Sequence, residues 1–326
     1  VYKGKSYRTR SPEDIVNEIE ENLSKHPYKS FYIDDDTFNI NKNHILGIAE
    51  ELVKRNLHHI PWGAMCRADL MTKEILTELK KAGLFSVKYG VESGSQEVLN
   101  DIDKKLDLNK VVEMINFTKE LGIKVHLTYT FGLPEDTTDT IENTISLACS
   151  LPSDSDQFSV ATPFPGTKMF EMYEKKGWIT TRNWDYYNGS AQAVSRTETF
   201  TGEQLLDFIQ TGARRSANAR VLRAVDSPEF ERKMDTFVRK QVPDGGRILV
   251  LQSAIYQLTQ QLVRILINSG FETHILLHRR FEPFFVKLLP ASRLHFFDQS
   301  GDFNSEYLRD FSEELQRKYI FNGAIV

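Results

Sequence analysis

Hydrophobic and polar residues alternate in two rhythms over the first 180 residues. Phe85, Val87 and Tyr89 are apolar at every second position, which is typical of a half-buried strand. Other stretches carry apolar residues three or four positions apart, which is typical of an amphipathic helix. Strands are predicted at residues 29–34, 60–68, from 86 onward, 123–131 and 156–161. Helices are predicted from Ser11 onward and at residues 43–56, 72–82, 109–121, 138–150 and 168–176.

Strand and helix therefore alternate with a period of about 30 residues, the size of one βαβ repeat. This alternation favours a parallel sheet with helices outside it. We assign it to an α/β domain of about five βα units, residues 1–180.

The pattern changes after residue 180. Residues 181–244 predict a helical extension, with a long basic helix at 202–224 that we interpret as a solvated helix packed against the first domain, followed by a linker. Residues 245–326 predict a second, Rossmann-like α/β domain. Its strands are predicted at 247–252, 273–277, 293–297 and the chain end, and its helices at 256–268, 281–289 and 306–318. No Gly-x-Gly-x-x-Gly follows its first strand, so a standard dinucleotide site is not predicted.

Composition narrows the class of protein. The net charge of −4 gives no support for a broad nucleic-acid surface, and no apolar run approaches the ~20 residues of a membrane span. The two cysteines, Cys66 and Cys149, lie far apart, which predicts no disulfide framework and favours a reducing cytoplasm. The chain starts at Val1 in the middle of a motif and ends at Val326 inside a predicted strand, so we expect it to be part of a longer polypeptide.

Distinctive polar residues follow the predicted strands at their carboxyl ends, the edge at which α/β sheets and barrels bind ligands. These candidate cofactor-binding residues are Asp35, Asp36, Arg67, Glu92, Ser93, Thr130 and Thr162. Glu92 and Ser93 stand out because Gly90 and Gly94 flank them, and glycine lets another backbone segment or a ligand approach closely.

Structural alternatives remain for several of these residues. The paired aspartates could cap a helix, Ser95 could be the N-cap of an ordinary turn, and Arg67 could pair with Asp69 or Glu92. His126 lies in the middle of a predicted strand, and we expect it to be packed in the core rather than catalytic.

Six short motifs occur in order at βα spacing. They are Ser11-Pro-Glu-Asp14, Asp35-Asp-Thr-Phe38, Arg67-Ala-Asp69, Gly90-Val-Glu-Ser-Gly-Ser95, Phe131-Gly-Leu-Pro134 and Thr162-Pro-Phe-Pro-Gly-Thr167. Over residues 1–180 the sequence resembles the radical S-adenosylmethionine (SAM) enzymes, in particular the branch that often carries a cobalamin-binding domain. The resemblance implies a partial (βα)6 barrel, a [4Fe-4S] cluster held by a Cys-x3-Cys-x2-Cys loop, reductive cleavage of SAM and, in some members, cobalamin-assisted methyl transfer.

The resemblance also implies roles for the candidate residues. Glu92 and Ser93 would contact the ribose or methionine part of SAM, and Arg67 would bind the methionine carboxylate. Asp35 and Asp36 would lie near the methionine amine or the substrate. The turn at Gly132 and the segment from Thr162, together with Thr130 at its strand end, would surround the adenine. A reductant such as flavodoxin or ferredoxin would be the partner, and the substrate is not readable.

The cluster motif itself is absent, since neither cysteine has triad spacing and both are interpreted as buried structural thiols. We expect the three-cysteine loop to lie upstream, which would leave this chain inactive by itself. The alternative is a barrel without a cluster that serves as a binding or scaffold protein.

Residues 247–326 loosely resemble the N-terminal half of heptosyltransferase-like glycosyltransferases, through stretches such as 247–255 and 274–278. A generic flavodoxin-like domain explains the same pattern equally well. A fused sugar transferase would make the protein bifunctional.

Overall fold

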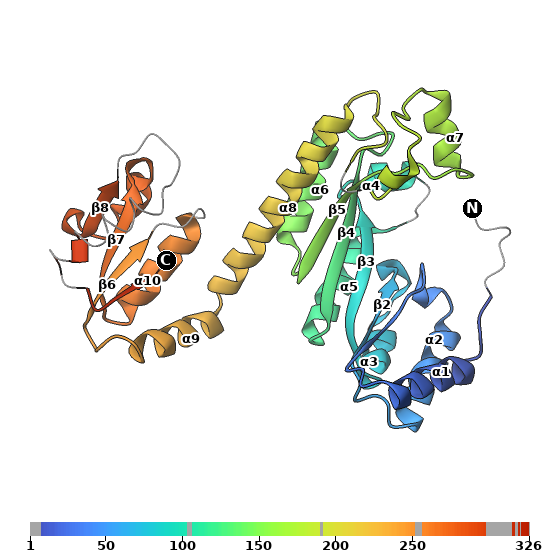
Figure 1. Ribbon diagram of the computed structural model, residues 1–326, viewed down its shortest axis with the longest axis horizontal. Helices are drawn as coiled ribbons and strands as arrows, with labels where there is room; N and C mark the ends of the chain where they lie inside the picture. The colour runs from blue at the N-terminus through green and yellow to red at the C-terminus, as the bar shows by residue number, and fades with distance from the viewer. Residues whose placement is uncertain are drawn as a thin grey trace. The chain divides into compact units, whose positions relative to one another are not determined.

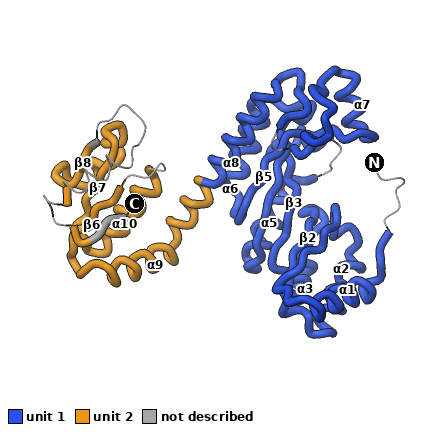
Figure 2. The backbone as a smooth tube through the Cα atoms, viewed as in Figure 1, with its two compact units in different colours: residues 1–217 blue, residues 218–326 orange. Residues whose placement is uncertain are grey.

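The chain forms two compact units, Val1–Ala217 and Asn218–Val326 (Figure 2). The computed structural model describes residues 8–102, 106–189, 192–251, 256–297, 315–316, 319 and 321–325. Each unit has its own parallel sheet and its own hydrophobic core. Among the helices of the described ranges, none is both long and apolar enough to cross a membrane.

The first unit is built on a five-stranded parallel sheet whose strands pair in chain order (Figure 1). The strands are β1 (Phe31–Ile33), β2 (Trp62–Cys66), β3 (Leu84–Glu92), β4 (Lys124–Phe131) and β5 (Ser155–Val160). Each connection thus carries the chain to the adjacent strand, as in the wall of a βα barrel. The predicted partial barrel of about five βα units is confirmed.

The helices of this unit begin where the sequence supplies a cap. They are α1 (Pro12–Lys25), α2 (Lys42–Lys54), α3 (Lys73–Lys81), α4 (Gln96–Asp101), α5 (Leu108–Glu120), α6 (Thr138–Ser150) and α7 (Lys168–Lys175). Helix α8 (Gly202–Val225) begins in this unit and ends in the second. Ser11 accepts a hydrogen bond from the Asp14 N–H, and Thr137 forms a capping box with Thr140 at the start of α6. The short helix α4 begins at Ser95, whose side chain accepts from the Val98 N–H, so the alternative that Ser95 is an N-cap is confirmed.

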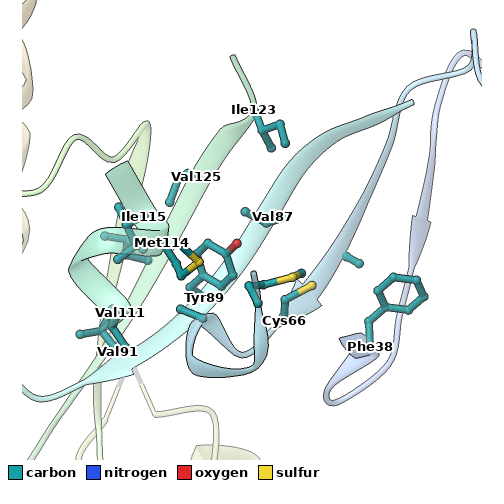
Figure 3. Packing of buried hydrophobic residues seen from close by; sticks show 14 of the residues in the cluster. Phe38, Cys66, Val87, Tyr89, Val91, Val111, Met114, Ile115, Ile123 and Val125 are labelled. Atoms are coloured by element: carbon teal, nitrogen blue, oxygen red, sulfur yellow. The ribbon is translucent and has the colours of Figure 1, made fainter. Parts of the chain in front are cut away.

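Alternation along the strands separates the two faces of the sheet. Val87, Tyr89 and Val91 of β3 are buried against α5 and its neighbours in the core of the unit (Figure 3). Lys88, Gly90 and Glu92 alternate with these residues and are half-buried on the opposite face. We call this second face of the sheet the open face.

The second unit has four parallel strands in the order β8-β7-β6-β9. They are β6 (Arg247–Leu251), β7 (Glu272–His278), β8 (Leu294–Phe297) and β9 (Gly323–Ile325), with helices α9 (Pro228–Arg239), α10 (Tyr256–Asn268) and α11 (Glu282–Phe285). The strand order reverses at β6, as in half of a Rossmann-like domain, which confirms the predicted α/β pattern. Most of the helix predicted at 306–318 lies outside the described residues.

Helix α9 is the clearest element that the prediction missed. The side chain of Ser227 accepts from the Phe230 N–H, and Pro228 occupies the first turn. Ser227-Pro-Glu229 repeats the Ser11-Pro-Glu13 start of α1, so the capping signal was present in the sequence.

We predict that the full chain unfolds in two thermal transitions, because the hydrophobic clusters of the two units share no residues. Leu79→Ala, in the core of the first unit, should destabilise only that unit by about 2–5 kcal/mol. Val263→Ala, in the core of the second, should lower only the other transition. Differential scanning calorimetry checks this, and a single transition moved by both variants would contradict it.

Candidate functional site

The structure places the candidate residues along one edge of the first sheet. Asp35 and Asp36 follow β1, Arg67 follows β2, Glu92 ends β3, Thr130 lies near the end of β4, and Thr162 follows β5. Because the strands are parallel and adjacent, these positions form a row at their carboxyl ends. Direct side-chain contact within this row is more limited.

Glu92 lies at a strained bend of β3. Its φ of 68° is in the left-handed region, which few residues other than glycine adopt. The pairing between β3 and β4 shifts register between Gly90 and Glu92. The Ser93 N–H then donates to the Val91 carbonyl across Glu92 at 2.9 Å, closing a three-residue γ-turn. Strain of this kind is retained at sites where a side chain must be aimed.

The hydroxyl of Thr130 donates to Oε2 of Glu92 at 2.8 Å. Glu92 and Thr130 are both half-buried, so the carboxylate is oriented but still reachable. Such a group can accept hydrogen bonds from hydroxyl or ammonium groups of a small polar ligand. The structure thus joins the candidate residues Glu92 and Thr130 directly.

Ser93 and Gly94 face the helix α6 instead. Ser93 is buried, and its hydroxyl lies 3.4 Å from that of Thr144, while the Gly94 N–H donates to the Thr144 hydroxyl at 2.8 Å. A Cβ on Gly94 would lie 2.7 Å from the backbone of Asn143. Of the two roles expected for the flanking glycines, close approach of a backbone is confirmed at Gly94, which allows α6 to pack against the turn.

Hydrogen bonds continue from this turn to the one after β4. The Thr144 hydroxyl donates to the Thr140 carbonyl at 2.8 Å, and the Thr140 hydroxyl donates to Asp136 at 3.0 Å. Asp136 also accepts from the Leu133 N–H at 2.9 Å, and burial raises the pKa of its carboxyl group. The sequence prediction missed this link, although a capped helix start beside the Gly132 turn was visible.

Arg67 forms the ion pair that had been left open as an alternative. Its guanidinium donates two hydrogen bonds to Asp69, at 3.1 and 2.8 Å, and this pairing raises the pKa of Arg67. The buried amide of Asn39 accepts from the Arg67 N–H and donates to its carbonyl, both at 2.8 Å. Asn39, which the sequence prediction missed, thereby ties the loop after β1 to the end of β2.

The loop after β1 carries the paired aspartates. Asp36 is exposed, whereas Asp35 is half-buried and accepts weakly from the Thr37 N–H at 3.5 Å. Neither aspartate is the N-cap of α2, since Asn41 takes that role. The helix-cap alternative therefore does not account for these two residues.

The two cysteines lie in different surroundings. Cys66 is buried in the core, and burial raises the pKa of its thiol, with nearby Asp35 adding to the effect. Cys149 lies on α6 and is only half-buried, so the prediction of a buried thiol was wrong for it. Within the described ranges, no group of three His, Cys, Asp or Glu side chains is arranged to hold a metal ion.

Thr162 and His126 each make a local hydrogen bond. The Thr162 hydroxyl donates to the Val160 carbonyl at 3.1 Å, close to the backbone of Gly189. His126 is not in the core as expected. It is half-buried on the open face, where its Nδ1 lies 2.7 Å from the Ser155 hydroxyl.

Comparisons with known proteins identify the family that this chain resembles. Residues 2–148 match the family model of the radical SAM superfamily. An uncharacterized methyltransferase from Pyrococcus horikoshii is 29% identical over 207 residues, which cover 64% of this chain and 45% of that protein. An anaerobic magnesium-protoporphyrin IX monomethyl ester cyclase from Cereibacter sphaeroides is 28% identical over 214 residues, 65% of this chain and 34% of that protein. The chain thus spans less than half the length of these relatives.

Solved structures share the fold at low sequence identity. The cobalamin-dependent SAM radical enzyme OxsB matches with a TM-score of 0.51 at 15% identity, covering 98% of this chain and 53% of its own. The radical SAM methyltransferase TsrM from Kitasatospora setae matches with a TM-score of 0.50 at 21% identity, covering 54% of this chain and 35% of its own. The predicted resemblance to this superfamily is confirmed, whereas the glycosyltransferase resemblance of the second unit stays a prediction.

We predict that Glu92→Gly is more stable than Glu92→Ala by about 1 kcal/mol, because both remove the carboxylate but only glycine relieves the positive φ. At exposed Glu50 in α2 the order should reverse, since alanine favours a helix over glycine by about 1 kcal/mol. Urea denaturation of the four variants measures both differences. Equal stability of the two Glu92 variants would show that the position is not strained.

We also predict that iodoacetamide modifies Cys149 well before Cys66 in the folded, reduced protein, because burial disfavours the Cys66 thiolate. Peptide mass spectrometry over time distinguishes the two sites. In urea both should react at similar rates, which serves as the control. Faster reaction of Cys66 in the folded protein would contradict the placement of its side chain.

Proposed function

We propose, because residues 2–148 match the family model of the radical SAM superfamily, that the protein containing this chain cleaves SAM reductively and uses the resulting radical on its substrate. The observation that carries the proposal is the Glu92 carboxylate. It is held by Thr130 at a strained bend on the ligand-binding edge of the sheet.

In this proposal Glu92 accepts hydrogen bonds from the ribose hydroxyls or the ammonium group of SAM. Charge-assisted bonds of this kind are stronger than bonds between neutral groups. Thr130 keeps the carboxylate oriented before the ligand arrives, and the Gly132 turn and the Thr162 segment flank the adenine. Asp35 and Asp36 lie toward the methionine amine or the substrate.

Two predicted contacts rank lower. Asp69 already occupies the Arg67 guanidinium and would compete with the methionine carboxylate for it. The Ser93 hydroxyl faces Thr144, so contact with SAM at this turn is assigned to Glu92. Glu92 is therefore the residue that tests the proposal best.

A [4Fe-4S] cluster, when bound, supplies the electron for this reaction and needs three cysteine ligands in this family. The two cysteines of this chain do not fit such a site, since Cys66 is in the core and Cys149 is on α6. We propose that residues outside this chain hold the cluster and that a flavodoxin- or ferredoxin-like protein delivers the electron.

Methyl transfer assisted by cobalamin is the second candidate outcome. It is supported by relatives whose names are those of methyltransferases, including a bacteriochlorophyllide d C-8(2)-methyltransferase from Chlorobaculum tepidum that is 26% identical over 200 residues. OxsB, which shares the fold, is a cobalamin-dependent enzyme. S-adenosylhomocysteine would accompany methyl transfer, whereas 5′-deoxyadenosine reports the radical cleavage.

We predict that the full-length protein, reconstituted with iron and sulfide without oxygen, forms 5′-deoxyadenosine from SAM and dithionite. Glu92→Gln should weaken SAM binding by about 10- to 100-fold, because a charged acceptor is lost. Thr130→Val should cause a smaller loss, since the carboxylate remains but is less well oriented. Equilibrium dialysis with SAM and chromatography of 5′-deoxyadenosine measure the two effects.

Glu50→Gln, an exposed carboxylate on α2, is the matched control and should retain full SAM affinity and turnover. Unchanged SAM affinity in Glu92→Gln would remove Glu92 from the cofactor site. If the reconstituted protein forms neither 5′-deoxyadenosine nor S-adenosylhomocysteine, the proposal that it cleaves SAM fails, and a binding or scaffold role takes its place.

A further inference from the structure

The open face of the first sheet carries basic groups that the proposed cofactor site does not use. Lys88 of β3 and His126 of β4 are register partners in the sheet. Partners on adjacent parallel strands point to the same side and lie about 4.8 Å apart along the hydrogen-bonding direction. Both residues are half-buried, so their side chains share one patch of the open face.

Ser155 of β5 extends this row to the next strand. It is the register partner of His126, and its hydroxyl lies 2.7 Å from His126 Nδ1. The hydroxyl therefore fixes the imidazole ring beside Lys88. On the other side of Lys88 lies Met65 of β2, which brings no charge.

Lys88 has no partner of opposite charge in this row. Within the described ranges, neither a hydrogen bond nor an ion pair joins its ammonium group to another residue. Asp34 lies just past the end of β1. Its backbone is two strand spacings, or about 10 Å, from the backbone of Lys88. A half-buried ammonium group beside an oriented imidazole is complementary to an anion.

Distance separates this patch from the cofactor edge. Lys88 precedes Glu92 by four residues on β3, which corresponds to about 13 Å along a strand. A group bound between Lys88 and His126 would thus lie deeper on the open face than a ribose or amine bound at Glu92. The two positions can therefore hold two different groups at the same time, one at Glu92 and one at Lys88 and His126.

We propose that Lys88 and His126 bind an anionic group of the substrate, a carboxylate or a phosphate, on the open face. Lys88 supplies the positive charge, and His126 supplies an N–H donor in the tautomer whose Nδ1 accepts from the Ser155 hydroxyl. The assignment rests on the proposed function, because it takes the open face to be where the substrate meets SAM. It adds that the substrate is an anion and that its anionic end points away from Glu92.

The test uses the full-length reconstituted protein and two probes, inorganic phosphate titrated by ³¹P NMR and acetate titrated by ¹³C NMR. Lys88→Gln should weaken binding of the preferred anion by at least about tenfold, and His126→Gln by a smaller factor. Lys81→Gln, which replaces an exposed lysine at the end of α3, should leave anion binding unchanged. The preferred probe identifies the group as phosphate or carboxylate.

Equilibrium dialysis with SAM separates this inference from the proposed function. Lys88→Gln should retain SAM affinity, and saturating SAM should leave anion binding intact. Anion binding that is unaffected by Lys88→Gln, or absent from the unsubstituted protein, overturns the inference. Competition between SAM and the anion also overturns it, because the patch would then belong to the cofactor. If the unsubstituted protein binds the anion but does not cleave SAM, the result counts against the proposed function alone.

Discussion

The hydrogen bond from Thr130 to Glu92 fixes the chemistry of the sheet edge. It joins two adjacent strands at the point where β3 leaves its regular register, and it orients the Glu92 carboxylate. The strain at Glu92 requires support from the surrounding structure. The register shift, the γ-turn and the packing against α6 supply that support.

The alternation of buried and half-buried residues along β3 and β4 gives the sheet of the first unit two different faces. From Val87 of β3 and Val125 of β4 onward, every second residue is buried in the core, and the residues that alternate with them are half-buried on the opposite face. The same pattern that stabilises the unit therefore supplies a polar surface leading to Glu92. Core formation and exposure of the site are two results of a single period of two residues.

The fold could be read from the sequence because its signals are local. Caps such as Ser11 and Thr72, and the alternation through Val87 and Tyr89, depend on residues a few positions apart. The missed helix α9 has the same kind of local signal, an N-cap at Ser227 followed by Pro228. The site was harder because its contacts are not periodic. Gly94 meets Asn143 and Arg67 meets Asn39 across long stretches of chain, and pattern alone cannot show such pairs.

The hydrogen bonds that run from the Ser93 turn through α6 to Leu133 also bear on the thermodynamics of binding. They link the turns after β3 and β4 through Thr144, Thr140 and Asp136, so both turns are held by one helix. A ligand that binds at this edge therefore has little loop entropy to remove. Its affinity is set by how well its own groups match the donors and acceptors already in place, and flexible analogues should lose affinity mainly through their own ordering.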